Sequence, residues 1–526
     1  MPGKPETWTP LRSIQKWMED STRCVATTFL ASLLVASLLS LWLQPLPIVH
    51  DEFSYLLAAD ALSQFSTSAE THEHWQHFES FHTIQQPRYA SKYPPGQSLA
   101  LAVGKLIGHP IIGANLTTAF AVASLMWLVI GWIPKSTHWL ACLLLVTHPN
   151  IQVEWGQSYM GGSLALAGSA LLLGAFFRID KRLQIGISSI AAVGVVILLY
   201  ARPMEGAVLT ATILCALFYW CLTNKDVNLG PFLKRVIAPA GILIAIAAGG
   251  LAAYNHSITG HALHMPYQIY EKQYGWVPLL LWHQPPEQSP KYNHETMQKF
   301  YEEDFNKRIQ SFSSVQSAIA NKSEFAFRSF RFFLKGSLVF ALLALPHLVS
   351  RRRIRNAVWI ALPAAIAGFM TPWSATHYLA PAASIVLLLA VVGLVHAWET
   401  TTNGNRKNNQ PFVFAFIALS QLLSLGPLLY QYKSNYEDGW WVCRHEIEQD
   451  FLEQPGEDLV FVRYGPEHNH HQEWVYNAID IDSAGVVWAR EISPESDAEL
   501  RAYFADRNFW LLEPENQYRI TPLGKE

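Results

Sequence analysis

The sequence has 526 residues, of which 50% are hydrophobic, 13% aromatic and 15% charged, and its formal net charge at pH 7 is -3. This balance provides no global basic field and so argues against a nucleic-acid-binding protein. A mean hydropathy of +0.13 is low for a helical bundle alone and indicates a membrane bundle joined to large polar segments. The five cysteines show no spacing typical of a disulfide framework or a metal site.

The first apolar run covers residues 24–48 and is long enough to cross a bilayer. A segment with several basic residues, 1–23, precedes it. The run is too long for the apolar region of a signal peptide, and no small-residue cleavage site is clear. We therefore expect an uncleaved anchor with residues 1–23 in the cytoplasm.

His50, Asp51 and Glu52 follow where the chain leaves this first span. Two adjacent carboxylates near a membrane cost free energy unless they meet a cation, a hydrogen-bond donor or water. The simple alternative is a pair of solvated acids in a loop.

Further apolar runs predict a polytopic helical membrane protein over residues 24–430, with about eleven spans in all. After the first span, they cover 111–134, 138–154, 160–178, 184–201, 204–222, 234–254, 330–350, 356–372, 378–398 and 411–430. Residues 97–109 are apolar but too short to span, and we expect an interfacial or re-entrant segment there.

Basic residues set the predicted orientation. If residues 97–109 crossed the membrane, Arg351, Arg352 and Arg353 would lie outside. If they do not cross it, the basic loops stay on the cytoplasmic side along the whole chain, as the positive-inside rule requires. Three large segments then lie outside: 49–96, 255–329 and 431–526. Within the second, residues 295–333 read as an amphipathic surface helix. In the third, strand candidates at 460–462, 486–488 and 509–512, with a helix at 497–504, predict a small α/β domain.

Polar residues at the predicted outer ends of the spans would line one cavity at the outer leaflet. Its acids and cations would suit the phosphate headgroup of a membrane lipid. These residues are Asp51, Glu52, Glu154, Gln157, Ser158, Tyr159, Arg202, Glu205, Tyr254, Asn255, His377 and Tyr378.

Simpler interpretations exist for several of these residues. Arg202 and Glu205 stand at i and i+3 and could form a local ion pair. His377 could be an ordinary interfacial histidine. The first-loop histidines His72, His74, His77 and His82 and the tail run 467–471 contain metal-ligand types, although loop histidines are more often solvated.

The chemistry that this cavity suits is glycosyl transfer from a lipid phosphate. A carboxylate beside an acceptor hydroxyl can act as general base. Positive side chains or a bound divalent cation, Mg²⁺ or Mn²⁺, can stabilise the departing phosphate.

The sequence resembles the GT-C superfamily of membrane glycosyltransferases, which includes the protein O-mannosyltransferases and the lipid A aminoarabinose transferases. An acidic pair in the first outside loop of a many-spanning protein is the hallmark of that superfamily. The segments are most similar to a bacterial branch of it. The matching stretches are HDEFSYLLAADAL (50–62), HFESFHTIQQPRYASKYPPGQ (77–97), SYMGG (158–162), ARPMEG (201–206), YNHSITG (254–260), MPY (265–267), HYLAP (377–381) and VRYGPEHNHHQEWVYNAIDID (462–482).

The resemblance implies that Asp51 is the catalytic acidic residue, with Glu52 beside it, in a pocket for a polyprenyl-phosphate sugar. It implies that Lys92 and Tyr93 belong to the loop element before the second span. His377, before Tyr378, stands where several relatives carry Arg or Lys, which leaves Arg202 and Lys92 as the stronger cations for the donor phosphate. Glu154 could be the second acid found in some relatives, and Asp51 with Glu52 could hold the metal.

We therefore expect a bacterial inner-membrane glycosyltransferase that moves a sugar from a polyprenyl-phosphate donor to an acceptor on the periplasmic side, where the C-terminal domain also lies. Membrane lipids and the donor are the expected partners. A lipid or glycan transporter, or a catalytically silent membrane protein that binds the envelope, is the alternative. Transporters commonly show internal repeats, and none of fixed period is evident here.

Overall fold

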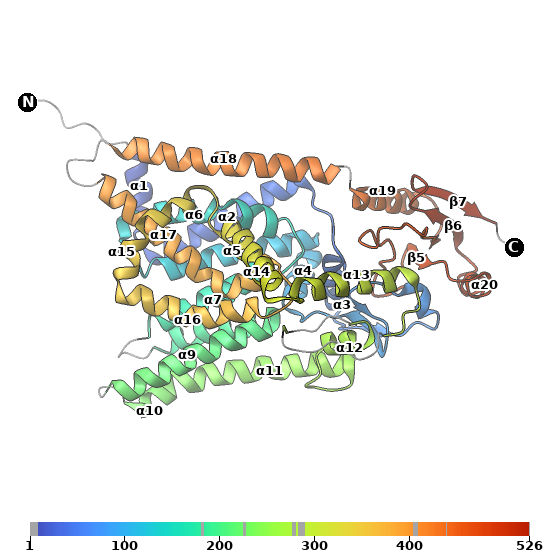
Figure 1. Ribbon diagram of the computed structural model, residues 1–526, viewed down its shortest axis with the longest axis horizontal. Helices are drawn as coiled ribbons and strands as arrows, with labels where there is room; N and C mark the ends of the chain where they lie inside the picture. The colour runs from blue at the N-terminus through green and yellow to red at the C-terminus, as the bar shows by residue number, and fades with distance from the viewer. Residues whose placement is uncertain are drawn as a thin grey trace, which may run out of the picture.

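The computed structural model describes residues 9–179, 184–224, 228–275, 280–281, 290–402, 409–437 and 439–524. Parts of the predicted segments 1–23 and 255–329 therefore lie outside the described residues. Figure 1 shows an elongated helical bundle with a smaller region at one end, where the strands and the C-terminus lie.

The bundle contains most of the helices. They are α1 (Thr9–Met18), α2 (Ser21–Leu43), α4 (Gly96–Leu106), α5 (Pro110–Val129), α6 (His138–Val146), α7 (Gly162–Phe176), α8 (Ile185–Ala201), α9 (Pro203–Thr223), α10 (Leu229–Phe232), α11 (Ala238–Thr259), α14 (Val315–Phe333), α15 (Leu345–Ser350), α16 (Arg352–Phe369), α17 (Ala380–Thr402) and α18 (Gln410–Glu437). Short 3₁₀ helices occur at Lys135–Thr137, Gly336–Ala344 and Thr376–Leu379, and π-helical turns at Ile151–Trp155 and Leu233–Ile237.

Six helices of the described chain are long and apolar enough to cross a membrane, and a bent pair raises this number to seven. The bundle is therefore that of a multi-pass membrane protein, but the predicted count of about eleven spans is not reproduced. Two predicted spans are shorter apolar helices, Gly162–Phe176 and Ile185–Ala201. A third, 138–154, divides into α6 and a π-helical turn.

Burial separates inner from outer helices. Helix α17 is central, and Leu387, Leu388 and Val391 are fully or almost fully buried in the main apolar core. Helices α11 and α18 run along opposite edges of the bundle in Figure 1, and their leucines and isoleucines are exposed, Ile246 and Leu422 among them. Exposed apolar side chains on membrane-length helices fit contact with lipid.

Glycine allows α7 and α8 to make a close contact in the bundle interior. A Cβ atom on Gly168 of α7 would lie 3.0 Å from the Gly194 carbonyl oxygen, and one on Gly194 of α8 would lie 2.7 Å from that of Gly168. Small residues at facing positions let two membrane helices approach at backbone distance. The pair therefore positions the end of α8, where Arg202 follows.

The predicted span 330–350 is wrong as a straight helix. Helix α14 ends at Phe333, and Gly336–Ser350 continues at an angle of 106°. Gly336 adopts a φ of +66° at this bend, a conformation that side-chain-bearing residues rarely take. The predicted amphipathic helix 295–333 is likewise two helices, α13 (Glu295–Phe312) and α14, because Ser314 caps the second through a hydrogen bond from the Ser317 amide at 3.1 Å.

Segment 97–109 forms the short helix α4, which ends at Leu106. Leu101 and Ala102 pack with Tyr55 and Ala114 in a small apolar cluster between α3 (His50–Ser63) and α5. The 11 residues of α4 are too few to cross a bilayer.

We call segments 49–96 and 255–329 the first and second outside loops, after the side that the sequence predicts for them. The first contains α3, a 3₁₀ turn at Trp75–Phe78 and a three-stranded antiparallel sheet of order β1-β3-β2. The strands are β1 (Ala69–Glu70), β2 (Thr83–Ile84) and β3 (Arg88–Ser91). The second large loop contributes α12 (Pro266–Gln273) and α13 beside it.

The C-terminal domain is the small α/β unit that the sequence predicts. Its elements are α19 (Trp440–Glu453), β4 (Asp458–Val462), β5 (Val486–Arg490), α20 (Pro494–Tyr503), β6 (Asn508–Glu513) and β7 (Arg519–Leu523). The sheet order is β5-β4-β6-β7, with β4 parallel to β5 and β6 and with β7 antiparallel at the edge. Strand β7 was not predicted, because its mixed sequence RITPL is not an apolar run; the proline is tolerated because the strand is an edge.

The C-terminal domain packs directly on α3. The hydroxyl of Tyr476 lies 2.7 Å from Nδ1 of His50, and the ring of Tyr476 stacks on Phe53 with a 4.0 Å centroid separation. Further along α3, the Ile479 amide donates a 2.9 Å hydrogen bond to Asp60. The tail therefore fixes the helix that carries the acidic pair.

A buried polar network joins the same domain to both outside loops. Arg490 and Glu473 form a buried ion pair, and Arg490 Nε donates to the Glu79 carbonyl oxygen at 2.8 Å. The Glu79 carboxylate accepts hydrogen bonds from Tyr274 at 2.6 Å and Asn293 at 2.8 Å. We refer to Glu79, Tyr274, Asn293, Glu473 and Arg490 as the Glu79–Arg490 network.

Candidate functional site

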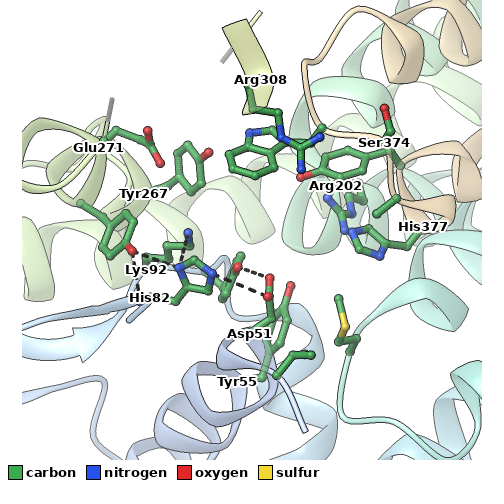
Figure 2. Close-up of a pocket in the computed structure, with 18 of the residues that line it drawn as sticks. Asp51, Tyr55, His82, Lys92, Arg202, Tyr267, Glu271, Arg308, Ser374 and His377 are labelled. Carbon is green, nitrogen blue, oxygen red and sulfur yellow. Dashed lines mark hydrogen bonds and ion pairs between the residues drawn. The ribbon is translucent and has the colours of Figure 1, made fainter. Parts of the chain in front are cut away.

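A cavity of about 440 Å³ lies where the bundle meets the outside loops. It brings together six of the residues singled out from the sequence: Asp51, Lys92, Tyr93, Arg202, His377 and Tyr378. They come from α3, the segment after β3, the α8–α9 junction and the 3₁₀ turn before α17. Figure 2 shows Asp51, Lys92, Arg202 and His377 around a shared space.

Asp51 lies in the first turn of α3, and its side chain faces the cavity. The Tyr93 hydroxyl donates a hydrogen bond to Oδ1, and His82 Nε2 lies 3.6 Å from Oδ2. The Asp51 side chain is 32% exposed, so a substrate in the cavity can reach it. Helix N-termini favour negative charge, which helps to keep a carboxylate there.

Glu52 is turned the other way and is outside the cavity lining. One of its oxygens accepts hydrogen bonds from the Ile48 amide at 2.7 Å and the Val49 amide at 3.4 Å. The other accepts from the Ser158 hydroxyl at 2.6 Å and the Tyr159 amide at 3.0 Å. Burial raises the pKa of Glu52, although these donors oppose the shift. Glu52 therefore holds α3 against the segment before α7.

Lys92 is a basic residue in the cavity lining. Its Nζ lies 2.8 Å from Nδ1 of His82 and 4.2 Å from the ring centroid of Tyr270. The rings of Tyr93 and Tyr267 lie 5.2 Å and 5.4 Å away. Tyrosine faces stabilise an ammonium group through cation–π attraction.

Arg202 stands between α8 and α9, where Pro203 prevents the first helix from continuing. Its guanidinium lies 4.6 Å from the ring centroid of Tyr378. Among the described residues, no carboxylate forms an ion pair with it within 4.0 Å, so the alternative of a direct pair with Glu205 is not what the geometry shows. Glu205 is buried in α9 outside the cavity lining.

The second outside loop adds residues that the sequence reasoning missed. Arg308 of α13 lines the cavity with its guanidinium 4.6 Å from the Trp373 ring centroid, and its buried Nε has no hydrogen-bond partner in the described residues. Glu271 of α12 lies on the same wall. Burial raises the pKa of Glu271, while Lys92 and a hydrogen bond from Tyr267 oppose the shift. The amphipathic pattern of α13 was the one signal that could have indicated Arg308.

Glu154 does not join the cavity. It is exposed on the π-helical turn before α7, and its electrostatic partner is Lys335. Lys335 in turn donates a 3.0 Å hydrogen bond to Asn150.

The metal hypotheses do not fit the donor geometry. Both oxygens of Glu52 are already hydrogen-bonded, so Asp51 and Glu52 do not present a shared ligand set. His72 contacts Asp482, and His77 contacts the Arg490 carbonyl and Ser496. In the part of the chain that the structure describes, no group of three His, Cys, Asp or Glu side chains could hold a metal ion.

Comparison with known proteins identifies the fold. ArnT from Cupriavidus metallidurans in the apo state superimposes with a TM-score of 0.50 and 11% sequence identity, over 94% of this chain and 93% of that chain. ArnT bound to undecaprenyl phosphate gives 0.46 and 12%, over 94% of both chains. The apo oligosaccharyltransferase of Archaeoglobus fulgidus gives 0.47 and 13%, over 92% of this chain and 69% of that chain. No protein-family model and no curated protein sequence matches.

The near-complete coverage of ArnT at a TM-score of 0.50 shows that this chain shares the ArnT fold. The resemblance drawn from the sequence is therefore confirmed for the fold, including the small C-terminal domain.

Proposed function

We propose that this protein is a glycosyltransferase that moves a sugar from a polyprenyl-phosphate donor to an acceptor. One observation carries the proposal: a single cavity presents the Asp51 carboxylate opposite the cations Lys92, Arg202 and Arg308, at the loop end of a membrane bundle. Arrangements of this kind can bind an anion and a hydroxyl group at once. The shared ArnT fold supports a polyprenyl-phosphate substrate, because one ArnT structure is bound to undecaprenyl phosphate.

Asp51 is the proposed general base. The acceptor oxygen forms a bond to the anomeric carbon as its proton passes to Asp51. The bond between that carbon and the phosphate oxygen breaks, and its electron pair remains on the phosphate. A positioned base contributes about 10²–10⁴-fold to such a step.

The basic side chains stabilise the negative charge that develops on the phosphate as this bond breaks. Arg202 and Arg308 form no ion pair with a carboxylate of the described residues and so can hold a phosphate. Preorganised charges in a site that excludes water stabilise a developing anion strongly. His377 and Tyr378 line the wall beside Arg202, where the apolar helices end, and the prenyl chain would continue into lipid from there.

We further propose that the cavity opens on the periplasmic side of a bacterial inner membrane, with the N-terminus in the cytoplasm. The basic residues Arg351, Arg352 and Arg353 support this orientation because they precede and begin α16 at the opposite end of the bundle from the sheet domain.

Label transfer tests the proposal. Full-length protein and its Asp51→Asn variant are expressed at equal levels in envelope membranes that otherwise lack it, and are supplied with a radiolabelled polyprenyl-phosphate sugar. We expect the wild-type protein alone to move label from the lipid carrier to an envelope product, which mass spectrometry then identifies. Equal transfer by Asp51→Asn would remove the proposed base. Label that crosses the bilayer while still attached to its carrier would favour a transporter.

A further inference from the structure

His82 lies between the two charged groups of the cavity that face one another, Asp51 and Lys92. Its Nδ1 is 2.8 Å from Lys92 Nζ, and its Nε2 is 3.6 Å from Asp51 Oδ2. Figure 2 shows the imidazole ring between the two side chains, with dashed lines to each.

The fold holds His82 in a conformation that histidine rarely adopts. Its φ is +61°, in the left-handed region. Its amide donates to the Tyr270 hydroxyl at 3.1 Å, and its carbonyl oxygen accepts from Ser54 at 2.6 Å. Unusual backbone conformations persist where the surroundings over-determine them, and they concentrate at functional sites.

The neighbours of His82 fix its tautomer. Nδ1 faces Lys92 at 2.8 Å and also lies 3.0 Å from the Tyr270 hydroxyl, which can act as donor or acceptor. An ammonium group has only donors, so Nδ1 must offer its lone pair. The ring proton is then on Nε2, which faces Asp51. Burial, together with the charge of Lys92, holds the pKa of His82 well below its ordinary value, so the ring is neutral.

We infer that His82 is a positioning residue that separates the base from the phosphate-binding cation: it accepts a hydrogen bond from Lys92, presents its N–H to Asp51 and keeps both aimed at substrate. The inference rests on the proposed function. Opposite charges attract strongly in a partly buried site. A neutral ring between them lets Lys92 attract the donor phosphate while Asp51 remains available to the acceptor hydroxyl.

Two amide substitutions separate the Lys92 contact of His82 from its Asp51 contact. Asparagine places its carbonyl oxygen near the position of Nδ1 and tolerates a left-handed backbone. It should retain the Lys92 contact and lose the one to Asp51. Glutamine reaches the position of Nε2 and should retain a donor toward Asp51 while it loses the acceptor for Lys92.

The expected result is a reciprocal pattern. In nanodiscs, His82→Asn should bind undecaprenyl phosphate within about threefold of wild type but turn over about tenfold more slowly. His82→Gln should bind it about tenfold more weakly and lose less turnover. The matched control is His74→Asn in the same loop but outside the cavity lining, which should change neither measurement.

A double variant keeps the test valid if glutamine disturbs the loop. If the binding loss in His82→Gln acts through Lys92, it should disappear when Lys92 is already methionine. An equal loss of binding and turnover in both single variants, or a loss that persists in the Lys92→Met background, would overturn the inference. If wild-type protein transfers no sugar, the proposed function fails, whereas undecaprenyl phosphate binding still decides whether His82 acts on Lys92.

Discussion

The cavity and the Glu79–Arg490 network are both built from charged side chains of the outside loops, but they differ in how those charges are satisfied. In the network, Arg490 is paired with Glu473, and the Glu79 carboxylate accepts hydrogen bonds from Tyr274 and Asn293. In the cavity, Arg202 and Arg308 lack a carboxylate partner among the described residues, and Asp51 remains partly exposed. Satisfied charges hold the loops together, whereas unsatisfied charges leave capacity for a substrate.

The strongest test of this contrast is the exchange of Asp51 for asparagine. Because the amide cannot accept the acceptor proton, we expect turnover to fall by about 10²–10⁴-fold. The unfolding temperature of the purified protein should remain close to that of the wild type. Asp450→Asn, at an exposed position on α19, is the matched control and should retain full turnover. A large loss of stability in Asp51→Asn would place Asp51 with the structural charges instead.

Arg490→Met should show the opposite behaviour. It leaves the buried Glu473 carboxylate without its partner, and breaking a buried ion pair typically costs about 3–5 kcal/mol. Thermal unfolding and limited proteolysis of the outside region measure this loss. Arg463→Met is the control, because its partner Glu491 forms an exposed pair that contributes about 0–1 kcal/mol. Similar losses of stability in Arg490→Met and Arg463→Met would show that the buried ion pair does not hold the loops together.

Arg202→Gln should weaken donor binding with little effect on unfolding. Hydrogen bonds to charged groups contribute about 1.5–3 kcal/mol, which corresponds to roughly 10- to 100-fold in affinity. Equilibrium titration of the protein in nanodiscs with undecaprenyl phosphate measures the change. Unchanged affinity together with a lower unfolding temperature would show that Arg202 stabilises the α8–α9 junction rather than a ligand.

The smallest expected effect is a dependence of stability on pH through Glu79. Burial acts to raise the pKa of Glu79, but hydrogen bonds from His294, Tyr274 and Asn293 outweigh it and lower the pKa below its ordinary value of 4.5. The stability that Glu79 contributes is therefore present above about pH 4.5 and is lost as the pH falls through the lower folded-state pKa. The difference in unfolding temperature between wild type and Glu79→Gln should shrink over this acidic range. A constant difference would mean that Glu79 ionisation is not involved.

Part of the cavity could be predicted because helix ends are visible in a sequence. Asp51, Arg202 and His377 each stand beside an apolar run, and a consistent topology places them on one side. The sequence could not predict that Asp51 lines the cavity and Glu52 does not, because the two residues are adjacent. Consecutive residues of a helix point about 100° apart, so one faces the cavity and the other the Ser158 segment.

Most of the remaining cavity residues come from the two large loop segments, 49–96 and 255–329. His82, Glu271 and Arg308 reach the site through a left-handed backbone, a short helix after a turn, and a surface helix. None of these features has a periodic pattern that fixes its place in space. Strand β7 and the bend at Gly336 were missed for the related reason that single residues, rather than runs, determine them.

The contact between Tyr476 and His50 has a consequence for how the protein is made. The two residues are separated by 426 positions, and the Asp60–Ile479 contact by 419. During synthesis, the helix that carries Asp51 leaves the ribosome long before the segment that braces it. A chain interrupted before residue 476 would hold a membrane bundle whose acidic helix lacks these two contacts. The contacts that brace α3 can therefore form only after segment 476–479 has been synthesised.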